Sequence, residues 1–230
     1  MNTKAFRLGL LIFSMLTLLV FARTQSGIGP TEKNFYYQPQ SPKLWLFDVA
    51  CGQLPGMCAD FSILRVFTIY SDTSQKTLDN EQNDYAWSTL HQELQIAQHL
   101  DPKFRDTYRL AEGLLPYDAN MPNEAVALLS KGSQVMDDWL IPLVASFIAS
   151  TQLNDKKRAL TLAQIATGKT NAPVMAFGFA SRLMKDEISL EAAIAFLQAR
   201  KQTLPPSMQH GIEIRIQKLK EQAESKPDAL

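Results

Sequence analysis

The sequence predicts an all-α protein, a solenoid of repeated helical hairpins preceded by one N-terminal transmembrane or signal helix. From residue 43 onward, apolar residues recur at spacings of three and four, which is the helical period, and almost no segment alternates with period two. Similar groups of apolar and small residues return about every 34 residues, which indicates a repeat architecture. The only long apolar run lies at the N-terminus.

The N-terminal segment of residues 1–24 has the pattern of a membrane anchor. A free amino terminus, Lys4 and Arg7 precede the apolar run LGLLIFSMLTLLVFA of residues 8–22, and a basic region followed by an apolar one is typical of export signals. As a helix the run measures roughly 22 Å, short of the ~30 Å hydrocarbon core. Apolar residues before Arg7 lengthen the helix, and the Arg7 side chain can reach the headgroups. We therefore expect an uncleaved transmembrane helix that holds the protein in the membrane through residues 5–22.

A signal cleaved after Ala22 is the alternative, because Val20-Phe21-Ala22 resembles a signal-peptidase site. A buried core helix fits less well, since the run is apolar on every face. In both export interpretations the basic residues stay cytoplasmic, and the chain after about residue 23 is exported. The expected location is the inner membrane, with a single span and the C-terminal domain in the periplasm.

Residues 25–42 are expected to link this segment to the folded domain. They contain two glycines, three prolines and no periodic apolar pattern, a composition typical of linkers. The aromatic residues 35–37 are expected to belong to this extended segment. Docking of the three rings on the membrane or on the domain is the alternative.

The helical domain is expected over residues 43–222 and contains two interleaved series of repeated residues. The members of the first series are Leu90, Leu94 and Ala97; Ala125, Leu129 and Gly132; Ala159, Ala163 and Ala166; and Ala192, Phe196 and Ala199. The members of the second series are Thr107, Leu110, Ala111 and Leu114; Ile141, Val144, Ala145 and Ile148; and Ala176, Phe179, Ala180 and Leu183. Because residues three and four apart share a helix face, each series marks one helix of a repeated hairpin.

Turns are expected between the two series, at Pro116–Asn123, Thr151–Lys157 and Lys185–Ser189. An earlier hairpin would consist of helices over residues 56–70 and 84–101, joined by a long linker, Ser71–Asp84. A terminal amphipathic helix over residues 209–222 would cap the array, as solenoids require. Residues 223–230 would form a charged tail.

These repeats resemble the tetratricopeptide repeat family, whose unit is a helix-turn-helix of 34 residues. The resemblance covers three consecutive units over about residues 103–205, with alanine in place of the family's glycine, and the second helix of an earlier unit. The segment of residues 43–70, the LDP of residues 100–102 and the Trp139-x-x-Pro142 pair are similar to bacterial membrane-anchored tetratricopeptide proteins. The resemblance implies about three and a half helical hairpins and a role in protein-protein interaction.

In this family, first-helix residues at positions two, five and nine of each unit line the concave groove. By this resemblance the groove residues are Arg105, Tyr108 and Glu112; Trp139, Pro142 and Ser146; and Val174, Phe177 and Ser181. Aromatic and arginine side chains are frequent anchors of protein interfaces, so a peptide or helix of a partner would bind to Tyr108, Trp139 and Phe177. The alternative is that these rings only complete the core between repeats.

Cys51 and Cys58 lie in a domain that we expect to be exported, where disulfides form and persist. On one continuous helix their Cα atoms would be about 10 Å apart, too far to bridge. Gly52, Pro55 and Gly56 interrupt the helix and can bring the two together. A disulfide and two buried free thiols therefore both fit the sequence.

Composition and motifs argue against nucleic-acid binding and against catalysis. The net charge is zero, with 23 basic and 23 acidic residues, whereas nucleic-acid binding relies on clustered Lys and Arg. His91, His99 and His210 are too scattered for a metal site, and the usual nucleophile, zinc and phosphate motifs are absent. Asp137 and Asp138 are expected to cap the following helix rather than to act as paired catalytic carboxylates. We expect no metal, no small-molecule cofactor and no enzymatic activity.

The expected function is that of a non-enzymatic scaffold or assembly factor of a bacterial cell-envelope complex, whose partner is another envelope protein. Each repeat of a solenoid contacts only its neighbours, which leaves an extended surface for binding. The alternative is a permanent structural subunit of a membrane complex, held by its transmembrane helix and linker. The two differ in whether substitution of the groove residues releases the partner.

Overall fold

The computed structural model describes Tyr37 and residues 43–74 and 80–224. The chain divides into two compact units, Met1–Tyr36 and Tyr37–Leu230, and the first of these lies outside the described residues. The expected anchor of residues 1–24, nearly all of the expected linker and residues 225–230 are therefore not part of this description. No helix among the described residues is both long and apolar enough to cross a membrane.

Every regular element of the described residues is a helix, which confirms the all-α prediction. The elements are α2 (Leu44–Cys51), α3 (Pro55–Ser74), α4 (Asn80–Leu100), α5 (Arg105–Gly113), the π-helix η1 (Leu114–Asp118), α6 (Pro122–Val135), α7 (Leu140–Thr151), α8 (Lys156–Thr167), α9 (Val174–Glu187), α10 (Leu190–Lys201) and α11 (Pro206–Glu224).

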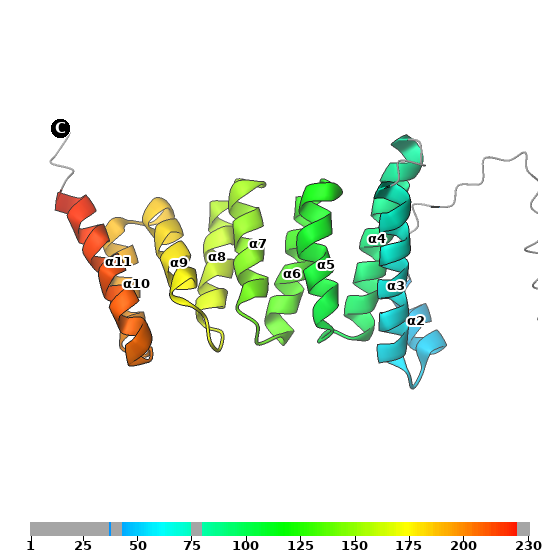
Figure 1. Cartoon of the computed structure of the whole chain (residues 1–230), viewed down its shortest axis with the longest axis horizontal. Coiled ribbons are helices and arrows are strands. Elements are labelled where there is room, and N and C mark those ends of the chain that lie inside the picture. The colour runs from blue at the N-terminus through cyan, green and yellow to red at the C-terminus, as the bar shows by residue number, and fades with distance from the viewer. Residues whose placement is uncertain (1–36, 38–42, 75–79, 225–230) are drawn as a thin grey trace, which may run out of the picture. The chain divides into compact units, whose positions relative to one another are not determined.

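The helices from α3 onward pack in series as hairpins (Figure 1). The helices α5, α7, α9 and α11 form one layer, and α4, α6, α8 and α10 form the other (Figure 1). Within the layers α5 contacts α7, α9 contacts α11, and α6 contacts both α4 and α8. Each hairpin is thus stabilised by its neighbours, as in repeat proteins.

Small residues at repeated positions let the two layers approach each other. Ala111, Ala145 and Ala180 of the first helices are completely buried, as the second series predicts. The first series is correct through α8 but one residue out of register in α10, where the buried residues are Ala193 and Leu197 rather than Ala192, Phe196 and Ala199. Ala125 of α6, Ala159 of α8 and Ala193 of α10 are all buried and lie 34 residues apart, so the period stays constant where the predicted series loses one residue. The packing of each hairpin on the next sets this register.

The linker predicted within the first hairpin, Ser71–Asp84, is helical in all of its described residues, 71–74 and 80–84. The helix α3 continues to Ser74, and α4 begins at Asn80. The polar residues that suggested a linker fit the helix because the hydroxyls of Thr73 and Ser74 both donate to the carbonyl of Tyr70.

The turn predicted at Pro116–Asn123 is also shorter than expected. Pro116 lies inside η1, and Pro122 is the first residue of α6, where its missing N–H group costs no hydrogen bond. The terminal helix likewise begins earlier than predicted, at Pro206. Asparagines with positive φ close three of the turns: Asn120, Asn154 and Asn171, with φ of 54°, 51° and 57°.

Hydrogen bonds also join the turns of successive hairpins. The Lys169 ammonium donates to the carbonyl of Met136 at 2.8 Å, and the Thr170 N–H donates to the Asp137 carboxylate at 3.1 Å. Asp138 accepts a hydrogen bond from the N–H of Leu140, the first residue of α7, at 3.0 Å, but the N-cap position is Trp139 and has no side-chain capping bond, so the predicted acidic N-cap is not found. Asp137 does not cap this helix; the hydrogen bonds from Thr170 lower the pKa of its carboxyl.

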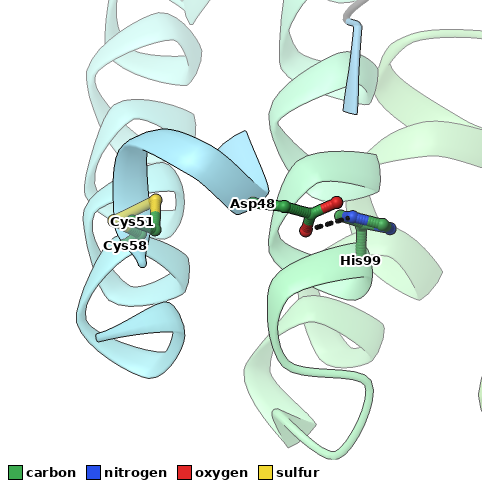
Figure 2. The surroundings of a disulfide bond; sticks show 4 residues. All are labelled: Asp48, Cys51, Cys58 and His99. Atoms are coloured by element: carbon green, nitrogen blue, oxygen red, sulfur yellow. Dashed lines mark hydrogen bonds and ion pairs between the residues drawn. A yellow bond between two sulfur atoms is a disulfide. The ribbon is translucent and has the colours of Figure 1, made fainter. Parts of the chain in front are cut away.

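The short helix α2 is joined to both helices of the first hairpin (Figure 2). Cys51 and Cys58 form a disulfide with their Cα atoms 6.1 Å apart, so the structure contains the first of the two alternatives that the sequence left open. Gly52, with φ of 51°, reverses the chain between them. One turn before Cys51, Asp48 Oδ1 lies 2.7 Å from Nε2 of His99 on α4.

Candidate protein-binding groove

Most of the residues predicted to line the groove lie inside the protein. Tyr108, Pro142, Ser146, Phe177 and Ser181 are buried; Glu112, Trp139 and Val174 are partly buried; and Arg105 is exposed. The rings of Tyr108 and Phe177 therefore complete the core between helices, as in the alternative interpretation, and do not face a partner. Binding through the predicted set is not supported at these two positions.

The buried members join each first helix to its surroundings. The Tyr108 hydroxyl donates to the carbonyl of Pro102 at 2.6 Å, and its ring packs against Gly132 of α6. The Ser146 hydroxyl donates to the carbonyl of Ala159 on α8 at 2.6 Å. These side chains thus hold the hairpins together rather than forming a surface.

On the first helices, several exposed residues lie one position after a predicted groove residue. Asp106, Gly113, Phe147, Met175 and Arg182 each follow a predicted groove residue and are exposed. One residue corresponds to a rotation of about 100° around the helix axis, enough to turn a core position into a surface position. The sequence of α7, LIPLVASFIAST, is apolar on nearly every side, so its apolar pattern does not distinguish the covered face from the open one.

An apolar groove of about 320 Å³ runs between α7 and α9. Its lining residues are Tyr117, Leu140, Leu143, Val144, Phe147, Met175 and Phe179. The side chains of Phe147 and Met175 are 47% and 62% exposed, a large fraction for apolar residues on a helix of a folded domain. The Phe147 and Phe179 rings, which both line the groove, lie 6.4 Å apart, within the range of aromatic pairs.

A second hollow of about 480 Å³ between α9 and α11 continues the groove, because Met175 and Phe179 line both. Its lining includes three basic residues, Arg182 of α9 and Arg215 and Lys218 of α11. None of these three forms an ion pair with a described residue. We refer to them as the basic end of the groove.

At the opposite end of the first-helix layer, on α5, the arginine side chains are paired with acidic side chains. Arg109 pairs with Glu112 at 2.9 Å and with Asp138 at 3.4 Å, and Arg105 also lies 3.4 Å from Asp138. The Asp138 carboxylate is 9% exposed, so both arginines are held against a buried acid. Among these residues, the basic side chains without an ion pair therefore lie at the basic end and not on α5.

No family model, curated protein or solved structure matches this chain. Its functional interpretation rests on the groove and on the sequence.

The histidines do not form a site together. His91 is partly buried, which lowers its pKa, while His99 contacts Asp48 and His210 is exposed. Within residues 43–74 and 80–224 no group of three or more metal-ligating side chains gathers.

The groove residues that the sequence analysis missed were present in the sequence as packing positions. Val144 and Phe179 belong to the second repeated series, and the structure leaves both half-buried in the lining of the groove. The basic end has no periodic signal, because Arg182 comes from α9 and Arg215 and Lys218 come from α11. Only the packing of α11 on α9 brings the three together.

Proposed function

We propose that this protein is a non-enzymatic scaffold or assembly factor of a bacterial cell-envelope complex, which binds a segment of a partner protein in the groove between α7, α9 and α11. The observation that supports this proposal is an apolar groove that leads into three basic side chains, none of which forms an ion pair with a described residue. Exposed aromatic residues beside arginine are the composition of interface hot spots.

The chemistry of the groove defines the partner segment. Two or three apolar side chains of a short helix or extended peptide would contact Phe147, Phe179 and Met175. One or more Asp or Glu residues would follow and pair with the basic end, where Arg182 offers a planar donor group to a carboxylate. An acidic amphipathic segment of another envelope protein fits both requirements.

The proposal also includes the cellular location of the protein and the type of its repeats. The serial hairpins and the buried small residues at a period of 34 are compatible with tetratricopeptide-like repeats. The disulfide between Cys51 and Cys58 supports an exported, oxidising location. The apolar run of residues 8–22 would anchor the chain in the inner membrane.

The test is a mild-detergent pull-down of the full chain from its own membranes. The groove variant carries Phe147→Ala and Met175→Ala, and a charge variant carries Arg182→Glu and Lys218→Glu. The control carries Val135→Ala and Ile165→Ala, two exposed apolar residues on the other helix layer. We expect wild type and control to recover a specific partner. The groove variant and the charge variant should each recover at least about tenfold less of it, because interface anchors contribute more than 1 kcal/mol each.

Retention of the same partner by all four proteins would contradict binding in the groove. It would favour the alternative, a permanent structural subunit held by its transmembrane helix and linker. Repeating the pull-down at high salt separates the ionic contribution to partner binding from the apolar one, since salt screens the pairing of the basic end with acidic residues.

A further inference from the structure

A second apolar surface lies at the N-terminal end of the array, away from the groove residues. Nine of the sixteen exposed large apolar side chains of the described residues belong to α2, α3 and the turn between them. We call eight of these nine the α2–α3 face: Trp45, Leu46, Val49, Leu54, Met57, Phe61, Leu64 and Phe67. The ninth, Tyr70, packs its ring against Trp87 of α4, with the ring centroids 6.1 Å apart. Exposed apolar side chains gathered in this way mark interaction sites.

The helix α3 is apolar on two opposite sides, of which only one is covered. Ala59 and Val66 are completely buried in the core of the first hairpin. Met57, Phe61 and Leu64 fall within about 60° of one another on the other side of the helix, and Phe61 is 64% exposed. No described segment covers this second side.

One carboxylate lies within the face, and a paired arginine borders it. Asp60 lies about 60° from Met57, between Leu64 and Phe67, and Arg65 lies about 80° from Met57 on the other side of the helix. The Arg65 guanidinium is 2.8 Å from the Glu93 carboxylate, and Asp48 contacts His99. The face is therefore mainly apolar, with the single carboxylate of Asp60 within it and no cluster of like charges.

Tyr37 determines how far this face can lie from the N-terminal apolar run. Its side chain is 9% exposed, and its hydroxyl donates to the Asp72 carboxylate of α3 at 2.6 Å. Burial and the neighbouring carboxylate raise the pKa of this hydroxyl, so it stays a donor at neutral pH. Residues 23–36 between the run and this contact reach at most about 50 Å when fully extended, and on the order of 20 Å as a coil.

We propose that the α2–α3 face lies in the interfacial region of a lipid bilayer. Its exposed aromatic residues include Trp45, the type of residue that membrane interfaces favour. The charged groups of Asp60 and Arg65 would remain at the level of the headgroups while the apolar side chains insert. This inference rests on the proposed membrane anchor, because a run of residues 8–22 in the bilayer keeps α3 within reach of the membrane surface.

The experiment uses the full chain reconstituted in phosphatidylcholine vesicles whose acyl chains are brominated, which quenches nearby tryptophan fluorescence. Trp87→Phe with Trp139→Phe leaves Trp45 as the only tryptophan, and Trp45→Phe with Trp87→Phe leaves Trp139. We expect brominated lipid to lower the Trp45 fluorescence on the order of twofold and to leave that of Trp139 unchanged, because only Trp45 would lie at acyl-chain depth. Zwitterionic lipid is sufficient, since the face has no basic cluster.

A second variant ties the quenching to the face itself. In the chain that retains Trp45, Met57→Ser, Phe61→Ser and Leu64→Ser together should restore the fluorescence, whereas Phe147→Ser in the distant groove should not. These three side chains are exposed, so circular dichroism should show unchanged helix content for both variants.

Equal quenching of Trp45 and Trp139 would overturn the proposal, as would a Trp45 signal that is protected from lipid by association of two copies of the chain. Extraction with alkaline carbonate tests the anchor separately. A chain that resists extraction while Trp45 stays unquenched keeps the anchor and refutes the lipid contact. A chain that is extracted but whose Trp45 is quenched by added vesicles keeps the lipid contact and refutes the anchor.

Discussion

At the scale of single residues, the contact between Tyr108 and Gly132 shows how one missing side chain permits a buried ring. The Tyr108 ring occupies the space where a Cβ atom of residue 132 would lie. Because the hydroxyl of Tyr108 is held by the carbonyl of Pro102, the ring cannot move aside without losing that hydrogen bond. Gly132 is therefore required by packing and not by its backbone conformation.

Gly132→Ala should lower the free energy of unfolding by about 1–3 kcal/mol, the usual cost of overpacking a core. Gly178→Ala is the matched control, because a Cβ atom at that helical position would contact nothing within 4 Å. It should raise the free energy of unfolding by about 0.5–1 kcal/mol through better helix propensity. Urea denaturation of both variants gives the two values, and equal effects would show that the Tyr108 ring repacks freely.

At the scale of elements, an ion pair and the apolar core join α3 to α4. Glu93 of α4 is a buried carboxylate, with 5% of its side chain exposed, and it pairs with Arg65 of α3. Burial raises the pKa of Glu93 above its ordinary value near 4.5, while Arg65 and a hydrogen bond from Ser62 partly offset this effect. The charged carboxylate is thus tolerated at neutral pH at some cost in stability.

The sign of the pH dependence follows from this raised pKa. Between pH 4.5 and the raised value the folded state holds the Glu93 proton more tightly than the unfolded state, so stability decreases as pH rises through this window. Glu93→Gln removes the titration. The free energy of unfolding of this variant minus that of wild type should therefore increase from pH 4.5 to pH 7.5, measured by urea denaturation. A difference independent of pH would show that Glu93 has the same pKa in both states.

At the scale of the whole described domain, each helix packs mainly on its neighbours in sequence. The last helix, α11, closes the array with the buried side chains Ile212, Ile216 and Leu219, while its other side is polar. Such an end cap stabilises the hairpin beside it and affects distant hairpins only through intermediates. Local stability should therefore vary along the array.

Ile212→Ala removes a completely buried side chain and should cost about 2–4 kcal/mol. The loss should be local: amide hydrogen exchange should accelerate in α9–α11 and stay unchanged in α3 and α4. Hydrogen exchange with mass spectrometry at peptide resolution measures both regions in one experiment. Uniform acceleration along the chain would instead indicate a single cooperative unit.

The sequence by itself determined the helical class, the period of about 34 residues and the small residues between the layers, because these depend on spacing along the chain. It left open the pairing of Cys51 with Cys58. Only the tertiary structure decided which side of each first helix is covered, since α3 and α7 are apolar on more than one side and periodicity cannot say which side a neighbour occupies. For the same reason the exposed Phe147, the buried Tyr108 and the basic end between α9 and α11 became apparent only from the packing of the hairpins.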